Sequence, residues 1–450
     1  MTKGKHKKQI TVGFVALGCP KNIVDSERML AEIAKGGFVL SADADNADVV
    51  VINTCGFIAP ARREAMDAIE QAVKRKNKGA VKKVIVAGCL AQREGRQLFD
   101  EAEGIDAIVG LGQRDKIADI IANTLAAETR GNFVSEQYGK VFDDRVRLRI
   151  TAAHFAYLRI SEGCGRNCSF CTIPSIRGKL HSKPGEWIIA EAAELVEAGV
   201  VELNVIAQDT GAYGRDLKPR KDLAGLLIKL EKIPNLKWIR LLYLYPTGVN
   251  ERIIETVAAS KKIVHYFDIP IQHINNQILK KMHRPGTKEE IRRLIKGLRS
   301  RMPDSALRTT LIVGFPGETE EQFCELLEFV KWARFDHLGC FTFYPESGTA
   351  AAEMPGQVPD EVKQHRKEEI MLAQQQIVFE KNRQRIGTDL VCLVDSVDRQ
   401  GRGKGRFYGQ APEIDSVCLV EKCSVAAGGF IRTRVIGERD YDLVVEQVLC

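Results

Sequence analysis

Long apolar runs are missing from this 450-residue chain, and their absence excludes one class of protein. No uninterrupted apolar stretch approaches the roughly 18 residues that a membrane-spanning helix needs. The first residues, 1–9, are basic but lead into a strand-like segment rather than into the apolar core of a signal peptide. We therefore expect no membrane anchor. Residues 1–10 are interpreted as a basic, disordered tail, with a weak nucleic-acid-binding arm as the alternative.

A strong excess of one charge is missing as well. The formal net charge of +7 permits an RNA or ribosomal partner without requiring one. Hydrophobic residues make up 44% and charged residues 28%, which is typical of a globular protein with an ample core, and the length predicts two or three domains. Twelve cysteines in a chain without an export signal indicate a reducing cytoplasm, and metal ligation rather than disulfide bonds.

The most informative pattern is the cysteine loop Cys164-x-x-x-Cys168-x-x-Cys171, which directly follows a strand-like run. Three thiolates on one loop suit three irons of a cubane cluster and leave the fourth iron without a protein ligand. A zinc site is the alternative, but zinc usually takes two Cys-x-x-Cys pairs or a nearby histidine. Neither is close to the loop, since His181 lies ten residues past Cys171. The spacing favours an iron–sulfur cluster.

Three further cysteines follow the strand-like segments 12–17, 48–53 and 84–87, each before a helical segment; they are Cys19, Cys55 and Cys89. Strand, cysteine and helix repeated three times predict a parallel α/β sheet. Because the carboxyl ends of parallel strands share one edge, these thiols should converge there. A glycine beside each cysteine would let the backbone approach a bulky ligand. The alternative is that each is a small buried residue.

The rest of the chain has two segments of different character. Residues 150–383 contain six strand-like runs that alternate with helices, which suggests an open partial (βα)6 barrel. These runs are 155–160, 200–206, 238–244, 264–269, 309–313 and 337–343. Residues 384–450 read as a small β-barrel with Gly-rich turns. The expected fold class is therefore α/β, with a parallel-sheet domain over 11–135, a partial barrel over 150–383 and a β-barrel over 384–450.

The cysteine loop, with Phe170 directly before its last cysteine, resembles the cluster loop of the radical S-adenosylmethionine (SAM) enzymes. The three N-terminal cysteines, and a C-terminal barrel that looks like a TRAM domain, narrow the resemblance to the methylthiotransferases. Three stretches are similar to the RimO type rather than the tRNA-modifying MiaB type, namely 17–27, 172–178 and 182–184. Lys183 departs from the arginine that many relatives have there.

This resemblance implies two [4Fe-4S] clusters and SAM as cofactors. Cys164, Cys168 and Cys171 would hold the cluster whose open iron binds SAM and releases a 5′-deoxyadenosyl radical. Cys19, Cys55 and Cys89 would hold an auxiliary cluster that carries the transferred sulfur. The implied substrate is an aspartate of ribosomal protein S12, methylthiolated at its β-carbon, and the implied partners include a reductase as electron donor and a source of sulfur.

Other candidates depend on position along the strands. Gln208-Asp209-Thr210 and Gln272-His273 follow the second and fourth barrel strands, where they either meet SAM or cap loops. Phe170, Gln208 and Gln272 are the cofactor-binding candidates beyond the cysteines. Weaker candidates are Glu318 for adenine binding, and Arg166 and Arg177, which either neutralise a substrate carboxylate or are solvated. Structural, packing or surface roles are expected for Cys324, Cys340, Cys392, Cys418, Cys423, Cys450, His181 and His283.

Two other functions compete with methylthiolation of a ribosomal protein. One is the same chemistry on a tRNA adenosine, and the other is a non-catalytic iron–sulfur redox sensor. Residues 384–450 contain nine basic and ten acidic residues, a net charge of −1, which suits a basic protein better than RNA, although the basic run 399–406 argues mildly for RNA. The acidic residues expected to contact such a protein are Asp395, Asp398, Asp440 and Asp442.

Overall fold

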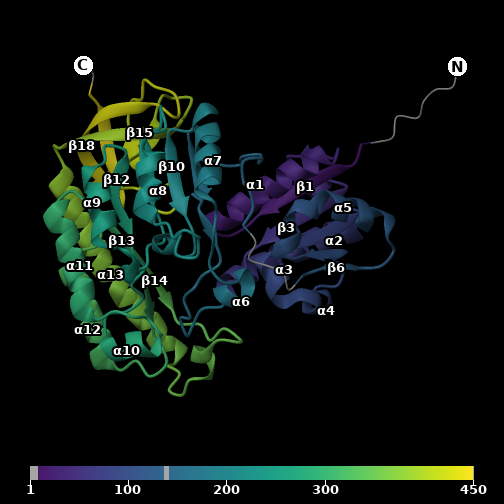
Figure 1. The fold of residues 1–450 in the computed structure, drawn as a ribbon, viewed down its shortest axis with the longest axis horizontal. Coiled ribbons are helices and arrows are strands. Elements are labelled where there is room, and N and C mark those ends of the chain that lie inside the picture. Colours follow the sequence, from purple (N-terminus) through teal and green to yellow (C-terminus); the bar gives the residue numbers. More distant parts are fainter. Residues whose placement is uncertain (1–8, 136–140, 449–450) are drawn as a thin grey trace. The chain divides into compact units, whose positions relative to one another are not determined.

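The computed structural model describes residues 9–135 and 141–448, so most of the basic tail predicted for residues 1–10 lies outside the described residues. The described chain forms two compact units (Figure 1). The first contains residues up to 150 together with 161–166 and 172–183, and the second contains the rest. Within the described ranges, no helix is both long and apolar enough to cross a membrane.

The first unit is built on a six-stranded parallel sheet in the order β2-β1-β3-β4-β5-β6. Its strands are β1 (Thr11–Ala16), β2 (Val39–Ser41), β3 (Val49–Thr54), β4 (Lys83–Gly88), β5 (Ala107–Val109) and β6 (Gly131–Phe133). Its longer helices are α1 (Pro20–Lys35), α2 (Ala59–Asn77), α3 (Cys89–Glu94) and α5 (Ile117–Ala126). The predicted parallel sheet is confirmed, and the sequence reading missed only strands of three residues.

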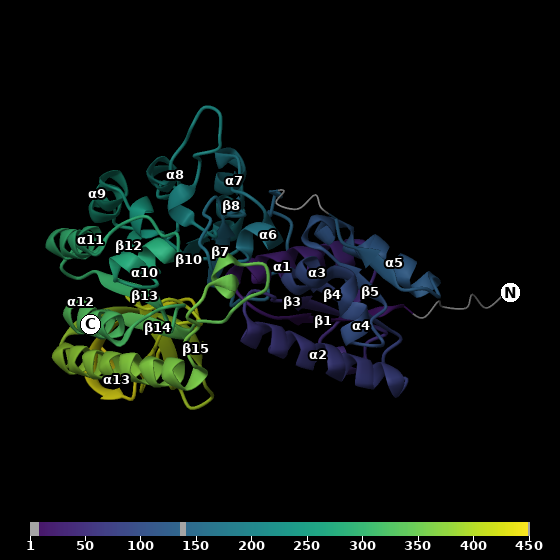
Figure 2. The same cartoon turned by 90° about the horizontal axis from the view of Figure 1, so that it is seen from below.

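Helices cover both faces of this sheet, with α1 and α5 on one side and α2 on the other (Figure 2). All six residues of β3 are buried, as expected for a parallel strand packed on both faces. Met29 of α1 packs on one face, and Ile69 of α2 packs on the other. The first unit therefore has its own core, and the loops that follow the strands lie at the edge of its sheet.

The second unit contains the predicted six-stranded barrel sheet, all parallel, in the order β14-β13-β12-β11-β10-β7. The strands are β7 (Phe155–Arg159), β10 (Glu202–Ile206), β11 (Trp238–Leu241), β12 (Ile263–Asp268), β13 (Ala306–Val313) and β14 (His337–Thr342). The helices are α7 (Gly185–Glu197), α8 (Leu223–Leu230), α9 (Glu251–Ala259), α10 (Asn276–Lys281), α11 (Lys288–Arg301), α12 (Glu320–Ala333) and α13 (Asp360–Arg385). Capping boxes at Thr287 and Thr319 start α11 and α12.

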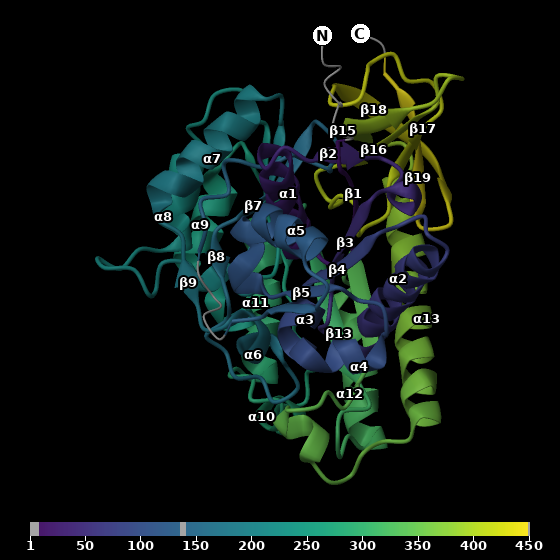
Figure 3. The same cartoon turned by 90° about the vertical axis from the view of Figure 1, so that its right-hand side faces the viewer.

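The long helix α13 leads into a closed five-stranded barrel (Figure 3). Its strands are β15 (Asp389–Val397), β16 (Gly403–Phe407), β17 (Cys418–Val420), β18 (Phe430–Arg439) and β19 (Asp442–Gln447). The predicted β-barrel is confirmed, and β16 is the strand that sequence reasoning missed. Its Gly403 and Gly405 read as turn residues, yet the barrel needs them because a Cβ on Gly405 would lie 2.5 Å from the Leu393 carbonyl oxygen.

Buried polar contacts join this barrel to the six-stranded sheet. Tyr157 donates to Glu413 at 2.8 Å, and Tyr266 donates to Asp415 at 2.6 Å. Glu202, the first residue of β10, pairs with the barrel's Arg406 at 2.8 Å. These contacts lie at and near the amino ends of the strands. The carboxyl ends, which carry the candidate site, face the other way.

Candidate metal centre

The three N-terminal thiols lie at one edge of the first sheet, as predicted. The register pairs Asn53 with both Ala16 and Ala87, so β1, β3 and β4 end at the same level. Cys55 directly follows β3, Cys89 begins α3 directly after β4, and Cys19 is the residue before α1. Cys55 and Cys89 are buried, while Cys19 is partly exposed.

Two of the glycines beside the cysteines make this convergence possible. Gly18 has φ +95°, and a Cβ there would lie 2.7 Å from the Cys55 Cβ and 3.4 Å from its Sγ. Gly88 has φ +96°, and a Cβ there would lie 2.3 Å from the Asn53 side-chain oxygen. The missing side chains make room for the neighbouring strand ends, and this brings the thiols together.

The environment acts differently on the three thiols. Burial raises the pKa of Cys19, but the charges of Lys21 and Arg177 outweigh it, so this pKa lies below its usual value. Burial, together with the nearby Cys19, raises the pKa of Cys55. Burial also raises the pKa of Cys89, to about 12. Since a metal ligand must be a thiolate, binding iron here would displace a proton from Cys89.

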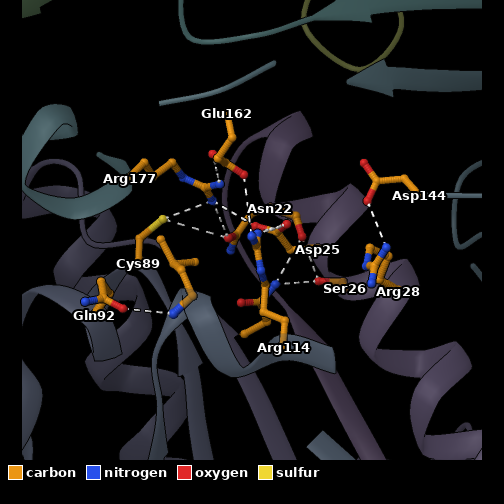
Figure 4. Close-up of polar contacts among 12 residues, drawn as sticks. Asn22, Asp25, Ser26, Arg28, Cys89, Gln92, Arg114, Asp144, Glu162 and Arg177 are labelled. Carbon is orange, nitrogen blue, oxygen red and sulfur yellow. Dashed lines mark hydrogen bonds and ion pairs between the residues drawn. The ribbon is translucent and has the colours of Figure 1, made fainter. Parts of the chain in front are cut away.

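A buried polar cluster lies beside these thiols (Figure 4). Arg177 donates from Nη2 to the Cys89 Sγ at 3.2 Å and to the Asp25 carboxylate at 3.0 Å. Its Nη1 donates to Glu162 at 2.9 Å. Arg114 pairs with the same two carboxylates. Arg177 is 1% exposed, so of its two alternatives surface solvation is wrong; the side chain is buried in the first unit against a cysteine and two carboxylates.

The cysteine loop is shared between the two units. Cys164 follows the short ladder of β8 (Ser161–Glu162) with β9 (His181–Ser182), and its N–H donates to the Gly178 carbonyl at 3.0 Å. A Cβ on Gly163, which has φ +70°, would lie 2.0 Å from the Lys179 carbonyl oxygen. Only glycine therefore fits this closely packed turn, and the turn fixes the first cysteine of the loop.

Cys168 and Cys171 belong to the second unit. The Cys171 N–H donates to the Cys168 carbonyl at 3.1 Å, and Ser169 between them donates from Oγ to the Lys281 carbonyl at 2.7 Å. Arg284 approaches the Cys168 Sγ at 3.8 Å. Phe170 packs on a small cluster that contains Met282 and Phe315. The loop is thus anchored on the end of α10, and its role as one three-thiol ligand set rests on its spacing in the sequence.

The donor chemistry fits iron–sulfur clusters. Both sets consist of thiols, the soft ligands that such clusters take. Among the described residues, no three His, Cys, Asp or Glu side chains come close enough to hold a single metal ion. A cubane cluster takes its cysteines one per iron, so its ligands stand farther apart than those of one ion.

The polar candidates along the second sheet differ in what they contact. Gln272 has a left-handed φ of +69°, and its buried Oε1 has no hydrogen-bond partner within the described chain. Thr210 instead donates to the Leu242 carbonyl, and His273 accepts from the Asn275 N–H at 3.0 Å. Gln208 lies two residues past β10. Thr210 and His273 therefore fix the loops that contain Gln208 and Gln272, respectively.

Glu318 is buried and fully engaged by the protein itself. It accepts from the Gly314 N–H at 2.9 Å and from Arg366 at 2.8 Å. It therefore closes the loop after β13, and these contacts are typical of a loop-holding carboxylate rather than of an adenine-binding one. Arg166 is partly exposed, and its N–H faces the Cys164 Sγ at 3.4 Å.

The remaining cysteines and histidines within the described residues lie in the packed or surface positions that were expected, and Cys423 is partly exposed. Cys340, Cys392 and Cys418 are buried, Cys324 is exposed, and Cys450 lies outside the described residues. His181 is exposed and contacts the Lys179 carbonyl, and His283 contacts the Asn167 carbonyl.

Three of the four acidic residues expected to contact a substrate protein already have partners within the chain, and the fourth, Asp440, is exposed. Asp395 binds Arg406 at 2.8 Å and His154 at 2.8 Å. Asp442 accepts from the Val417 N–H. Asp398 pairs with Arg402 in an exposed turn. A count of charges cannot show that Asp395 joins the barrel to His154, the residue directly before β7.

Sequence reasoning also missed part of the centre. Asn22 and Asp25 lie in the stretch 17–27 that resembles the RimO type. The sequence therefore indicated this stretch, but not the contacts of these two side chains. Glu162, two residues before Cys164, could have been found by its position. Arg114 had no signal, because only the fold brings it to Asp25.

Three family models match the chain: "Uncharacterized protein family UPF0004" over residues 11–110, "Radical SAM superfamily" over 158–330 and "TRAM domain" over 386–448. Curated relatives named "Ribosomal protein uS12 methylthiotransferase RimO" cover nearly the whole chain. Those from Syntrophomonas wolfei and Geobacter sulfurreducens are both 43% identical, covering 97% and 99% of this chain and 100% and 99% of their own length. The relative from Pelotomaculum thermopropionicum is 44% identical over 98% of this chain and 100% of its own length.

The chain belongs to the RimO family. A solved structure agrees at the level of the fold: the radical SAM methyltransferase TsrM from Kitasatospora setae matches with a TM-score of 0.52 and 15% identity, over 76% of this chain and 77% of that one. The MiaB-type alternative is not favoured, since these RimO relatives match over their full length.

Proposed function

We propose that this RimO-family chain methylthiolates the β-carbon of an aspartate in ribosomal protein S12, with SAM as both methyl donor and radical source. The observation that carries the proposal is the 43–44% identity to RimO proteins over nearly the whole length of both chains. All six candidate cysteines lie within the matched length. The redox-sensor alternative does not explain a chain that matches an enzyme family from end to end.

The ligands that we propose for the two clusters are the two cysteine sets. Cys164, Cys168 and Cys171 would hold the SAM-binding cluster, and Cys19, Cys55 and Cys89 the auxiliary one. When bound, these groups supply a 5′-deoxyadenosyl radical and the sulfur that is transferred. Hydrogen abstraction by a radical suits the target, because the β-carbon C–H is too weakly acidic for a protein base.

The protein itself orients the reactants. We propose that the Gln272 Oε1 accepts a hydrogen bond from a donor group of SAM, since this buried oxygen has no partner within the described chain and its left-handed backbone fixes its direction. Gln208, which follows β10 at the same carboxyl edge of the sheet, would make a second contact, and Phe170 would shield the cysteine loop from water. Keeping water out protects a short-lived radical.

The reaction also needs partners that the chain does not contain. We propose a cytoplasmic reductase as electron donor and a separate source of sulfur, since each turnover consumes both. Within the basic run 399–406, the charge of Arg406 is paired inside the protein, whereas Arg399, Arg402 and Lys404 are exposed, so the run keeps only its mild support for a tRNA substrate.

The direct test is to incubate anaerobically reconstituted enzyme, reductant, sulfide as the sulfur source, and SAM with either purified ribosomal protein S12 or unmodified tRNA. S12 should gain about 46 Da, as one hydrogen is replaced by a methylthio group, and the tRNA should be unchanged. Methylthioadenosine in the tRNA without a mass shift on S12 would overturn the substrate assignment.

Two variants test the proposed ligand sets in the same assay. Cys55→Ala should keep some cleavage of SAM to 5′-deoxyadenosine while losing the methylthio product, whereas Cys168→Ala should lose both. Wild-type protein should hold about eight irons per chain, as expected for two cubane clusters. Normal product from Cys55→Ala would show that the N-terminal set does not provide the sulfur.

A further inference from the structure

Arg177 comes from the segment that follows the cysteine loop, yet its side chain lies against a cysteine of the other ligand set. It is the last residue of α6 (Ile173–Arg177), six positions past Cys171. Its Nη2 donates to the Cys89 Sγ at 3.2 Å, and its guanidinium is 1% exposed. A charged donor this close to a thiolate, shielded from water, makes a strong hydrogen bond.

The surrounding groups hold this guanidinium in place. Arg177 also donates to Asp25 at 3.0 Å, Glu162 at 2.9 Å and the Asn22 side-chain oxygen at 3.3 Å (Figure 4). These contacts occupy both ends of the guanidinium fork, so its plane cannot rotate away from Cys89.

The charges of this buried polar cluster explain how Arg177 can be buried beside Arg114. Arg114 already pairs with both Asp25 and Glu162, and all of these side chains are at least 97% buried. Two arginines and two carboxylates are neutral together, so a Cys89 thiolate would add one negative charge beside Arg177. A buried arginine is costly unless it is fully paired, and the sulfur completes its pairing.

The same segment also carries the first cysteine of the loop. Gly178, directly after Arg177, accepts from the Cys164 N–H at 3.0 Å. The backbone at this point thus holds a ligand of one set while the Arg177 side chain contacts a ligand of the other.

We propose that Arg177 is a positioning residue for the auxiliary cluster: its hydrogen bond to the Cys89 sulfur fixes this ligand and raises the reduction potential of the cluster. Donors to a ligating sulfur stabilise the more negative, reduced state, so the potential rises with each such bond. This inference rests on the proposed function, because it takes Cys89 as a cluster ligand.

The test uses the background Cys164→Ala, Cys168→Ala, Cys171→Ala, which isolates the auxiliary cluster. Redox titration followed by electron paramagnetic resonance gives the potential of that cluster alone. Arg177→Gln should shift the potential to a more negative value, and Arg177→Lys, which keeps the charge but loses the fork, should give a smaller shift. Arg114→Gln is the matched control, since Arg114 pairs with the same carboxylates and none of its described contacts is to a cysteine.

The outcomes separate this inference from the function on which it rests. A background protein without about four irons would overturn the proposed ligand set, and the inference with it. If the background holds its cluster but Arg177→Gln leaves the potential unchanged, only the inference fails. Equal shifts in Arg177→Gln and Arg114→Gln would also overturn it, because a general charge effect would then account for both. If Arg177→Gln does not fold, an unshifted potential in Arg177→Lys overturns the inference.

Discussion

Single carboxylates in the C-terminal barrel have different roles that depend on their partners. Asp395 is partly buried and pairs with Arg406 and His154, whereas Asp398 lies in an exposed turn with Arg402. Both residues are aspartates of one strand-and-turn segment, and sequence reasoning treated them alike. Only one of them joins the barrel to the rest of the second unit.

We predict that Asp395→Asn lowers the free energy of unfolding by about 1–3 kcal/mol, because it removes the charge that pairs with the buried Arg406 and His154. Asp398→Asn is the control and should change it by no more than about 0.5 kcal/mol, as is usual at exposed sites. Urea unfolding measures both. Similar values for the two variants would mean that Asp395 is not part of the joint.

The same residue predicts a dependence on pH. Burial raises the pKa of Asp395, but the bonds from His154 and Arg406 outweigh it, so this pKa lies below its usual value. A lowered carboxyl pKa stabilises the fold above the unfolded-state pKa of about 3.9, and this contribution is lost as the pH falls through the lower folded-state pKa. When the pH is lowered through this range, the free energy of unfolding of Asp395→Asn should therefore fall less than that of the wild type.

At the scale of elements, the turn between β1 and α1 decides whether the N-terminal thiols meet. Pro20 begins α1 directly after Cys19, which fixes the start of the helix. Gly18 before it takes a conformation that other residues rarely adopt, against the Cys55 side chain. The strand, the glycine and the helix start together place Cys19.

We predict that Gly18→Ala destabilises the protein by about 2–5 kcal/mol, from left-handed strain and from overpacking against Cys55. Gly37→Ala is the matched control, because Gly37 has φ +82° with nothing within 4 Å of a Cβ, so it should show only the strain, about 1–2 kcal/mol. Iron analysis should show loss of the auxiliary cluster in Gly18→Ala alone. Full iron content in that variant would contradict the close packing.

At the scale of the whole molecule, the C-terminal barrel is part of the second unit's structure. Glu413, Asp415 and Arg406 of the barrel engage Tyr157, Tyr266 and Glu202 of the parallel sheet. Without the barrel, these sheet residues would be left with buried polar groups unpaired, which is costly. An RNA- or protein-binding role would add to this structural role rather than replace it.

We predict that a chain truncated after residue 385 is insoluble or unfolds without a cooperative transition. Circular dichroism during thermal unfolding, with the full chain as the reference, checks this. A soluble, cooperatively folded truncation would show that the barrel is an independent module. A double variant of the exposed barrel residues Arg432 and Arg434 to Ser, which leaves those buried contacts intact, should unfold like the wild type.

The sequence by itself determined most of the longer strands, the two cysteine sets and the resemblance to the family. Alternation of apolar strands with helices is a local signal, so the strands at 49–54 and 155–159 were predictable. The spacing of Cys164, Cys168 and Cys171 is also local, and the parallel sheet then placed Cys19, Cys55 and Cys89 at one edge. Features that depend on residues close together in the sequence could be predicted without the structure.

Only the tertiary structure decided which charged side chains from separate parts of the sequence pair with one another. Arg177 meets Cys89 and Asp25, and Asp395 meets Arg406 and His154, across sequence separations that carry no periodic signal. Burial then sets their behaviour, because a paired charge inside the protein cannot serve as a solvated surface group. The strand β16 was missed for a similar reason: its glycines are needed only because the neighbouring strand passes so close to them.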